Sequence, residues 1–287
     1  MTNGVNFRAP ALPYPPKMYD AQSFEEYNKV LRIYFNQLDN ALRNAMAVQE
    51  PYDLQVSKGQ IAGAIALYKF GFNTDIDGTE ETIWTQGGNV PWPTAAFTAY
   101  VVSDAAADSS AGTGAQVLQV EGLDADYKIK SVSVTLNGTT PVAVSGTWIR
   151  VNRAYVTLSG SGGSAAGTIH VQNSDASTVY ANLSTGNQTQ MAVYTVPAGY
   201  TLYLDDVNFT AAISQANNAA TVKLVTREFG SNTFRTRFIH TLQSNQHIDK
   251  FEYPLGLPEK TDIEARAFTS NTNNQIGASF QGVLIAN

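Results

Sequence analysis

The residues from 73 to 78 form the stretch of the chain best suited to holding a cation. They read Asn-Thr-Asp-Ile-Asp-Gly, so oxygen-bearing side chains stand at alternate positions before a glycine. This spacing matches the opening of an EF-hand calcium loop. The twelfth position, where such a loop needs a bidentate glutamate, is Trp84. We therefore interpret the stretch as an Asx-rich turn, with a calcium loop as the alternative, and predict no metal site.

Two pairs of neighbouring carboxylates are candidates for acid–base chemistry. Glycosidases need two carboxylates at a defined separation on one cleft. Asp205 and Asp206 are adjacent and therefore point to opposite faces of a strand, whereas Asp124 and Asp126 belong to the turn GLDADY. The sequence also lacks the G-x-S-x-G, P-loop, dinucleotide-binding and H-E-x-x-H motifs. It predicts that the protein is not an enzyme.

Composition excludes several further classes of site. The chain has 287 residues and no cysteine, which excludes disulfides, thiolate zinc sites and cysteine catalysis. The three histidines, His170, His240 and His247, are too scattered to suggest a metal cluster, and we predict no cofactor. The net charge is -6, and phosphate contacts need clustered Lys and Arg, so no nucleic-acid partner is expected.

Hydropathy gives an expectation about membranes and export. The longest apolar stretch, residues 61–67, is far shorter than the roughly 18 residues that a membrane span requires. The N-terminal residues lack the apolar core of a secretory signal. We expect a protein made in a cytoplasm, not exported by that route, and without a membrane partner.

Charge is distributed unevenly along the chain. Residues 1–49 carry a net charge of +1, residues 50–126 carry -9 and residues 127–287 carry +2. The acidic middle block has two interpretations: a solvated, self-repelling surface, or a cation site or face that docks on a basic neighbour.

The first 19 residues are predicted to form an extended anchoring arm. Four prolines, at positions 10, 13, 15 and 16, remove backbone donors and favour polyproline geometry. The arm also carries apolar groups that a solvated tail does not need, and we expect these to contact another protein: Leu12, Tyr14, Met18 and Tyr19.

Residues 20–50 are predicted to form one long helix. Asp20 or Ser23 can cap its start, and Pro51 stops it. Apolar and aromatic residues repeat with heptad spacing along one face, at Phe24, Tyr27, Leu31, Tyr34, Leu38 and Ala41. Nothing else in the sequence reads as a long helix that covers this face. We therefore expect self-association, with a homotrimer favoured because the aromatic positions suit a broad bundle; packing on its own domain is the alternative.

The rest of the chain is predicted to be mainly β. Residues 51–93 read as an acidic connector with short strands and turns, and residues 94–287 as antiparallel β-sandwich or jelly-roll structure. Asn137-Gly138 predicts a hairpin turn. The glycine- and serine-rich stretch 159–167 suggests a flexible break between two subdomains.

Several stretches resemble virion structural proteins of tailed bacteriophages, especially marine cyanophage and pelagiphage podoviruses. They are APALPYPPKMYD, RIYFNQLDN, KFGFN, IWTQGG, AGTGAQVLQVEGLDADYK, VTLNGTTPV, IRVNRAYV, YTVPAGYTLYL, LGLPEKTDIEARA and SFQGVLI. One departs from the pattern, because Phe72 in KFGFN stands where an arginine is usual.

The resemblance implies a multimeric, often trimeric, capsid or tail appendage that is assembled in the host cytoplasm and located in the virion. Its partners would be other copies of itself and other virion proteins such as capsid, portal, neck or tail components. A host-surface receptor-binding protein that recognises glycans is the alternative function.

Overall fold

A computed structural model describes residue 18 and residues 20–47, 50–184, 186–215, 218–243, 245–271 and 273–287. The chain divides into two compact units, one ending at Gln60 and one spanning Ile61–Asn287. We call them the N-terminal unit and the β unit. Of the predicted anchoring residues, Leu12, Tyr14 and Tyr19 lie outside the described residues.

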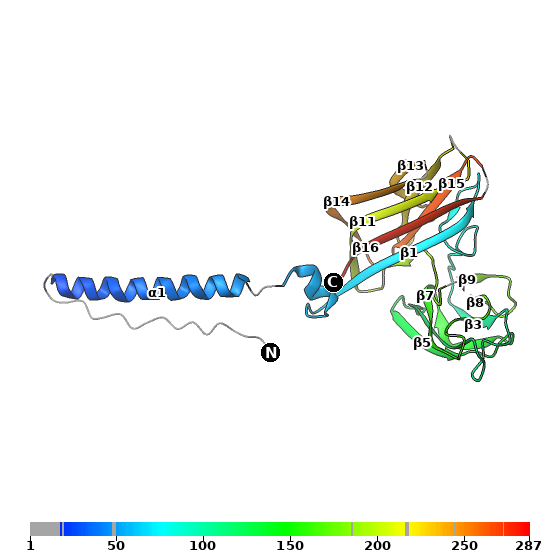
Figure 1. Ribbon diagram of the computed structural model, residues 1–287, viewed down its shortest axis with the longest axis horizontal. Helices are drawn as coiled ribbons and strands as arrows, with labels where there is room; N and C mark the ends of the chain where they lie inside the picture. Colours follow the sequence, from blue (N-terminus) through cyan, green and yellow to red (C-terminus); the bar gives the residue numbers. More distant parts are fainter. Residues whose placement is uncertain are drawn as a thin grey trace. The chain divides into compact units, whose positions relative to one another are not determined.

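The N-terminal unit contains the predicted long helix. Helix α1 spans Ala21–Ala47, and a short helix α2 follows at Tyr52–Ser57 (Figure 1). The Asp20 carboxylate caps α1 by accepting hydrogen bonds from the backbone N–H of Gln22 at 3.2 Å and of Ser23 at 3.1 Å. Pro51 stands directly before α2, where a missing N–H costs the helix nothing.

The β unit has two hydrophobic cores, and each collects buried residues from two antiparallel sheets. The first, which we call the terminal core, takes strands from both ends of the unit. One of its sheets has the order β1 (Ala64–Ile76), β16 (Asn274–Ala286), β11 (Tyr200–Ala212), β14 (Gln246–Leu257). The other has the order β10 (Val193–Thr195), β15 (Asp262–Thr269), β12 (Ala220–Arg227), β13 (Arg235–Leu242), with β2 (Glu81–Thr82) also paired to β15.

The second core, which we call the inserted core, is formed by the strands between β2 and β10. One sheet has the order β6 (Val142–Trp148), β3 (Phe97–Ser103), β8 (Ile169–Gln172), β9 (Val179–Leu183). The other has the order β5 (Ile129–Thr135), β4 (Ala115–Leu123), β7 (Arg150–Ser159). Figure 1 shows these strands in green, gathered beside the sheet that contains β1 and β16.

Side-chain alternation explains which face of each strand is buried. In β11, Leu202 and Leu204 are fully buried, and so are Val207 and Phe209. The change from even to odd positions coincides with a register shift between Leu204 and Asp206 in the pairing of β11 with both neighbours. A bulge of one residue in β11 relative to β16 keeps the apolar side chains on the core side of the sheet.

The structure differs from three sequence predictions about domain organisation. The segment 51–93 is more than a connector, because β1 and β2 belong to sheets of the terminal core. Asn137-Gly138 makes no hairpin: β5 before it pairs with β4, and β6 after it pairs with β3 in the other sheet. The predicted break at 159–167 does not separate the two cores. This stretch links β7 and β8, which both belong to the inserted core, and that whole core lies in the sequence between strands of the terminal core.

The glycine-rich stretch 159–167 is held in place by a buried carboxylate. Asp108 is fully buried and accepts hydrogen bonds from the backbone N–H of Ala166 at 2.8 Å, Gly167 at 3.0 Å and Ala115 at 2.7 Å. The Ser103 hydroxyl donates a fourth at 2.5 Å. Burial acts to raise the pKa of Asp108, but these hydrogen bonds outweigh it and hold the pKa below its usual value. The predicted flexible break is therefore an ordered loop.

A candidate ligand cavity between the two cores

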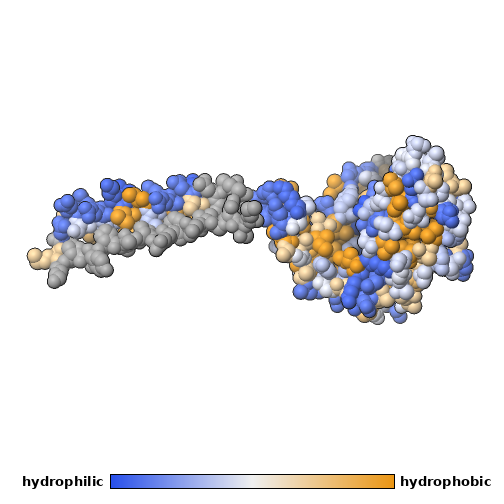
Figure 2. Space-filling model, turned by 90° about the horizontal axis from the view of Figure 1, so that it is seen from below, coloured by the Kyte–Doolittle hydropathy of each residue, from blue (hydrophilic) through white to orange (hydrophobic). Residues whose placement is uncertain are grey.

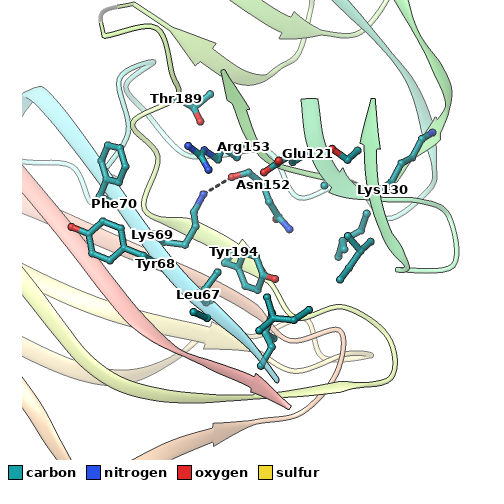
Figure 3. A pocket seen from close by; sticks show the side chains of 17 residues that line it. Leu67, Tyr68, Lys69, Phe70, Glu121, Lys130, Asn152, Arg153, Thr189 and Tyr194 are labelled. Atoms are coloured by element: carbon teal, nitrogen blue, oxygen red, sulfur yellow. Dashed lines mark hydrogen bonds between the residues drawn. The ribbon is translucent and has the colours of Figure 1, made fainter. Parts of the chain in front are cut away.

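A cavity of about 530 Å³ lies in the β unit where strand β1 of the terminal core faces β4, β5 and β7 of the inserted core (Figure 3). Its volume falls within the range of about 300–1,000 Å³ typical of small-molecule sites. Apolar atoms make up most of its walls, and several polar side chains also line it. This combination is typical of a ligand-binding pocket.

Lys69 is the central polar group of the cavity. It lies on the inward face of β1, is 7% exposed and donates a hydrogen bond to the backbone carbonyl of Asn152 on β7. The pKa of Lys69 is lowered to about 7, mainly by burial and in smaller part by nearby Arg153, while Glu121 opposes the shift. The amine therefore changes its protonation state near neutral pH.

Two further donors face the same space. The side-chain amide of Asn152 accepts a hydrogen bond from the N–H of Thr195 through Oδ1, which leaves its NH2 group without a partner among the described residues. The Tyr194 hydroxyl likewise has no hydrogen-bond partner in that part of the chain, and burial raises its pKa. Figure 3 shows the Lys69 amine directed at the Asn152 carbonyl, with the side chains of Asn152 and Tyr194 beside it.

The remaining charged groups on the lining are already engaged. Arg153 donates to Gln188 at 3.0 Å and lies over the ring of Tyr155 at 4.5 Å. Glu121 accepts a hydrogen bond of 3.0 Å from the Tyr155 hydroxyl, and burial together with this bond raises the pKa of Tyr155. Lys130 donates to the Thr147 carbonyl at 3.0 Å, so its ammonium group is bonded outside the cavity.

Apolar side chains from both cores form the rest of the lining. Ile65 of β1 is 40% exposed and Ile129 of β5 is 54% exposed. Leu67, Leu123 and Leu284 line the interior. The visible face of the β unit carries other hydrophobic atoms, drawn orange in Figure 2. Exposed isoleucines from two different cores at one cavity leave apolar surface that a bound apolar group would cover.

A buried ion-pair cluster fixes the two cores to each other near this cavity. Asp262 of β15 is 3% exposed and accepts from Arg150 of β7 at 2.9 Å and 3.0 Å. Arg227 donates to the same carboxylate at 2.6 Å and 3.1 Å, and the Thr195 hydroxyl donates at 2.6 Å. The carboxylate is thus fully used in joining the cores.

The stretch 73–78 has the predicted turn geometry. Asn73 Oδ1 accepts the backbone N–H of Asp75 at 2.9 Å, and Asp77 Oδ1 accepts that of Thr79 at 2.7 Å. These i to i+2 contacts are Asx turns, and Asp75 accepts a further bond from the N–H of Asn273. The described residues contain no group of three or more His, Cys, Asp or Glu side chains placed to hold a metal ion.

One carboxylate of each predicted pair accepts hydrogen bonds from groups of the protein. Asp124 Oδ1 accepts the N–H groups of Asp126 at 2.9 Å and Lys128 at 3.0 Å, which closes the predicted turn. Asp206 accepts a hydrogen bond of 2.6 Å from the side chain of Gln281.

The acidic block divides between internal and exposed groups. Glu80 pairs with Lys223 and, at 3.4 Å, with Arg266, while Glu81 accepts the N–H of Gly88. Burial acts to raise the pKa of Glu80, but Lys223 and Arg266 hold it below its usual value. Several acids of this block therefore stabilise the β unit itself.

The six predicted interface residues do lie along one side of α1. Phe24 is exposed, and Tyr27, Leu31, Tyr34, Leu38 and Ala41 are half-buried. Met18, the one predicted anchoring residue within the described part, is 83% exposed. Nothing in the structure tests whether these groups bind a partner, so both assignments stay predictions.

Sequence reasoning missed the cavity, although one signal was present. Lys69 and Gly71 share the inward face of β1, so a lysine stands where the alternation places core residues. A Cβ atom at Gly71 would lie 2.2 Å from the carbonyl oxygen of Ile83, which explains the glycine in KFGFN. Phe72 points to the opposite face of the sheet, and its ring lies beside Gly277 of β16, so close that a Cβ atom added to this glycine would be 3.6 Å from the ring. Phe72 thus packs on the outer face of the sheet.

Comparison with known proteins adds no relative. No family model matches the sequence, and no curated protein matches it significantly. Within the described part of the chain, no helix is long and apolar enough to cross a membrane.

Proposed function

We infer that the chain is a structural component of a tailed-phage virion, a homotrimeric capsid or tail appendage attached through its N-terminal residues. The resemblance of its sequence stretches to podovirus virion proteins motivates the proposal. Asp124, Asp108 and Asp262 contribute to a turn, a loop and an ion-pair cluster, which suits a structural role.

One observation carries the proposal: α1 is a 27-residue helix with large apolar side chains in contact with solvent. Phe24 is 57% exposed, Phe35 58% and Leu42 54%. Figure 2 shows orange and blue atoms along the visible side of this helix. An isolated helix gains most of its stability from packing an amphipathic face, so this surface favours association with identical helices.

We also propose that each core of the β unit is a β-sandwich of the jelly-roll kind. The support is that each core collects buried residues from two separate antiparallel sheets. A sandwich of this sort leaves the loops at its ends free for contacts with other virion proteins.

The mass of the full chain in solution tests the association. We expect 92.7 kDa, three times the chain mass of 30.9 kDa, by light scattering at micromolar concentration. Leu31→Asp with Leu38→Asp should yield monomer, because two charges would be buried in the bundle. The matched control, Gln37→Asp with Asn40→Asp at exposed helix positions, should stay trimeric. A clean monomer for the unaltered chain would contradict the trimer.

Glycan recognition at a host surface is the second candidate. Tyr68 is 63% exposed and Tyr203 44% exposed. Their pairing positions with β16 place both on the outer face of one sheet, with Gln281 between them. Flat aromatic rings next to amide and carboxylate groups suit sugar binding. Tyr68→Ala with Tyr203→Ala should abolish adsorption of particles while leaving assembly intact; normal adsorption would exclude this surface.

A further inference from the structure

We propose that the cavity between the two cores binds a small carboxylate with an aliphatic body, of the class of medium-chain fatty acids. The ligand would place its carboxylate against Lys69 and its hydrocarbon chain between the apolar walls. This inference concerns the β unit alone and goes beyond the proposed virion role.

The polar side of the cavity is built to receive a hydrogen-bond acceptor. The Lys69 amine has three donor positions when protonated, and one is used on the Asn152 carbonyl. The Asn152 NH2 group and the Tyr194 hydroxyl add donors that have no partner among the described residues. These donors line the cavity, where a bound acceptor can reach them, and a carboxylate accepts several such bonds through two oxygens.

Charge points to an anion rather than a neutral acceptor. Two charged groups act on the Lys69 amine of β1: Arg153 of β7 and Glu121 of β4. Lys130 of β5 is bonded to Thr147 and over the ring of Trp148 at 4.3 Å. Two cations face one acid, so protonation of Lys69 leaves an excess positive charge that a carboxylate would neutralise.

The walls favour an aliphatic ligand over a sugar acid. The lining includes the rings of Tyr68, Phe70 and Tyr194, but branched aliphatic side chains reach the cavity from the strands of both cores: Ile65, Leu67, Leu123, Ile129 and Leu284. The exposed areas of Ile65 and Ile129 would be covered by a hydrocarbon chain, which gains free energy in proportion to the apolar area removed from water. The hydroxyls of a sugar would lose their water against these walls without new partners.

Calorimetric titration of the full chain with octanoate, octanol and glucuronate, each below any micelle concentration, tests the proposal. Octanoate should bind at least tenfold more tightly than either of the others, since a hydrogen bond to a charged group contributes about 1.5–3 kcal/mol, or roughly 10–100-fold. Lys69→Met should weaken octanoate binding at least tenfold, and Tyr194→Phe should weaken it by a smaller factor. Lys128→Met, on the exposed turn, should change nothing.

Proton uptake gives a second, independent readout. At pH 8 most Lys69 amines are neutral, because burial lowers the pKa to about 7. A bound carboxylate would favour the protonated form of the Lys69 amine, so octanoate binding should be accompanied by proton uptake. This uptake is measured as a dependence of the heat of binding on the ionisation enthalpy of the buffer. The dependence should vanish in Lys69→Met. Equal affinity for octanol, tighter binding of glucuronate, or no proton uptake would each overturn the proposal.

Discussion

The Asp262 cluster gives the sharpest prediction about stability. In Asp262→Asn, the new NH2 group would face the donors of Arg150 and Arg227 in place of an acceptor. Arg150 is only 6% exposed, so its charge would stay buried without its anion. Breaking a buried ion pair by removing one partner costs about 3–5 kcal/mol.

This loss can be expressed as a melting temperature. For a unit of about 150–250 residues, 1 kcal/mol corresponds to roughly 2–4 °C. The β unit covers Ile61–Asn287, so Asp262→Asn should melt about 6–20 °C below the unaltered chain. Because Arg150 and Asp262 belong to strands of different cores, the loss should also weaken their coupling.

Calorimetry combined with tryptophan fluorescence measures both effects. Trp84 and Trp148 are buried in the inserted core, and Trp92 packs against it while donating to Glu264 of β15, so fluorescence follows that core and its contact with the terminal core. Asp126→Asn is the matched control, since it makes the same chemical change at an exposed turn residue and should shift the melting temperature by no more than about 1–2 °C. Equal shifts for the two variants would refute the claim that the buried carboxylate joins the cores.

Three further predictions follow from single groups. The pKa of Lys69 is lowered to about 7, so between about pH 7 and 10 the unfolded chain binds more protons than the folded one, and the free energy of unfolding should rise with pH. In Lys69→Met, urea unfolding should show a slope of this free energy against pH that is smaller by up to about 1.4 kcal/mol per pH unit. An unchanged slope would contradict the burial of the amine. Asp108→Asn should lower the free energy of unfolding at pH 7 by about 2 kcal/mol. Because the pKa of Asp108 in the folded chain lies below its usual value, the stability that the carboxylate contributes should disappear as the pH falls below about 4. A variant that loses stability in acid as steeply as the unaltered chain would contradict this. Excess EDTA should leave the melting temperature unchanged, because Asp75 and Asp77 bond to backbone N–H groups; a drop of many degrees would show that they hold a metal.

Local features of the fold could be predicted from the sequence. Asp20 and the heptad repeat define α1 through interactions within a few residues, and the structure has that helix. Alternating side chains predicted antiparallel β structure, and the Asx turn at Asn73 needs only its own neighbours. Capping, alternation and turn chemistry are local, so the sequence states them directly.

Features that depend on distant pairing could not be predicted. Asn137-Gly138 has the chemistry of a hairpin, yet its flanking strands pair with partners elsewhere. Lys69 meets the carbonyl of a residue 83 positions later, and Arg150 meets an aspartate 112 positions later. The nested order of the cores decides these contacts, and no local pattern encodes that order.

A cryo-EM map of purified particles tests the central claim most directly. The account predicts density for three copies of the chain at each attachment site, with three α1 helices packed together along Tyr27, Leu31 and Leu38. Absence of the chain from the particle, or single copies whose α1 packs on no other copy, would contradict it.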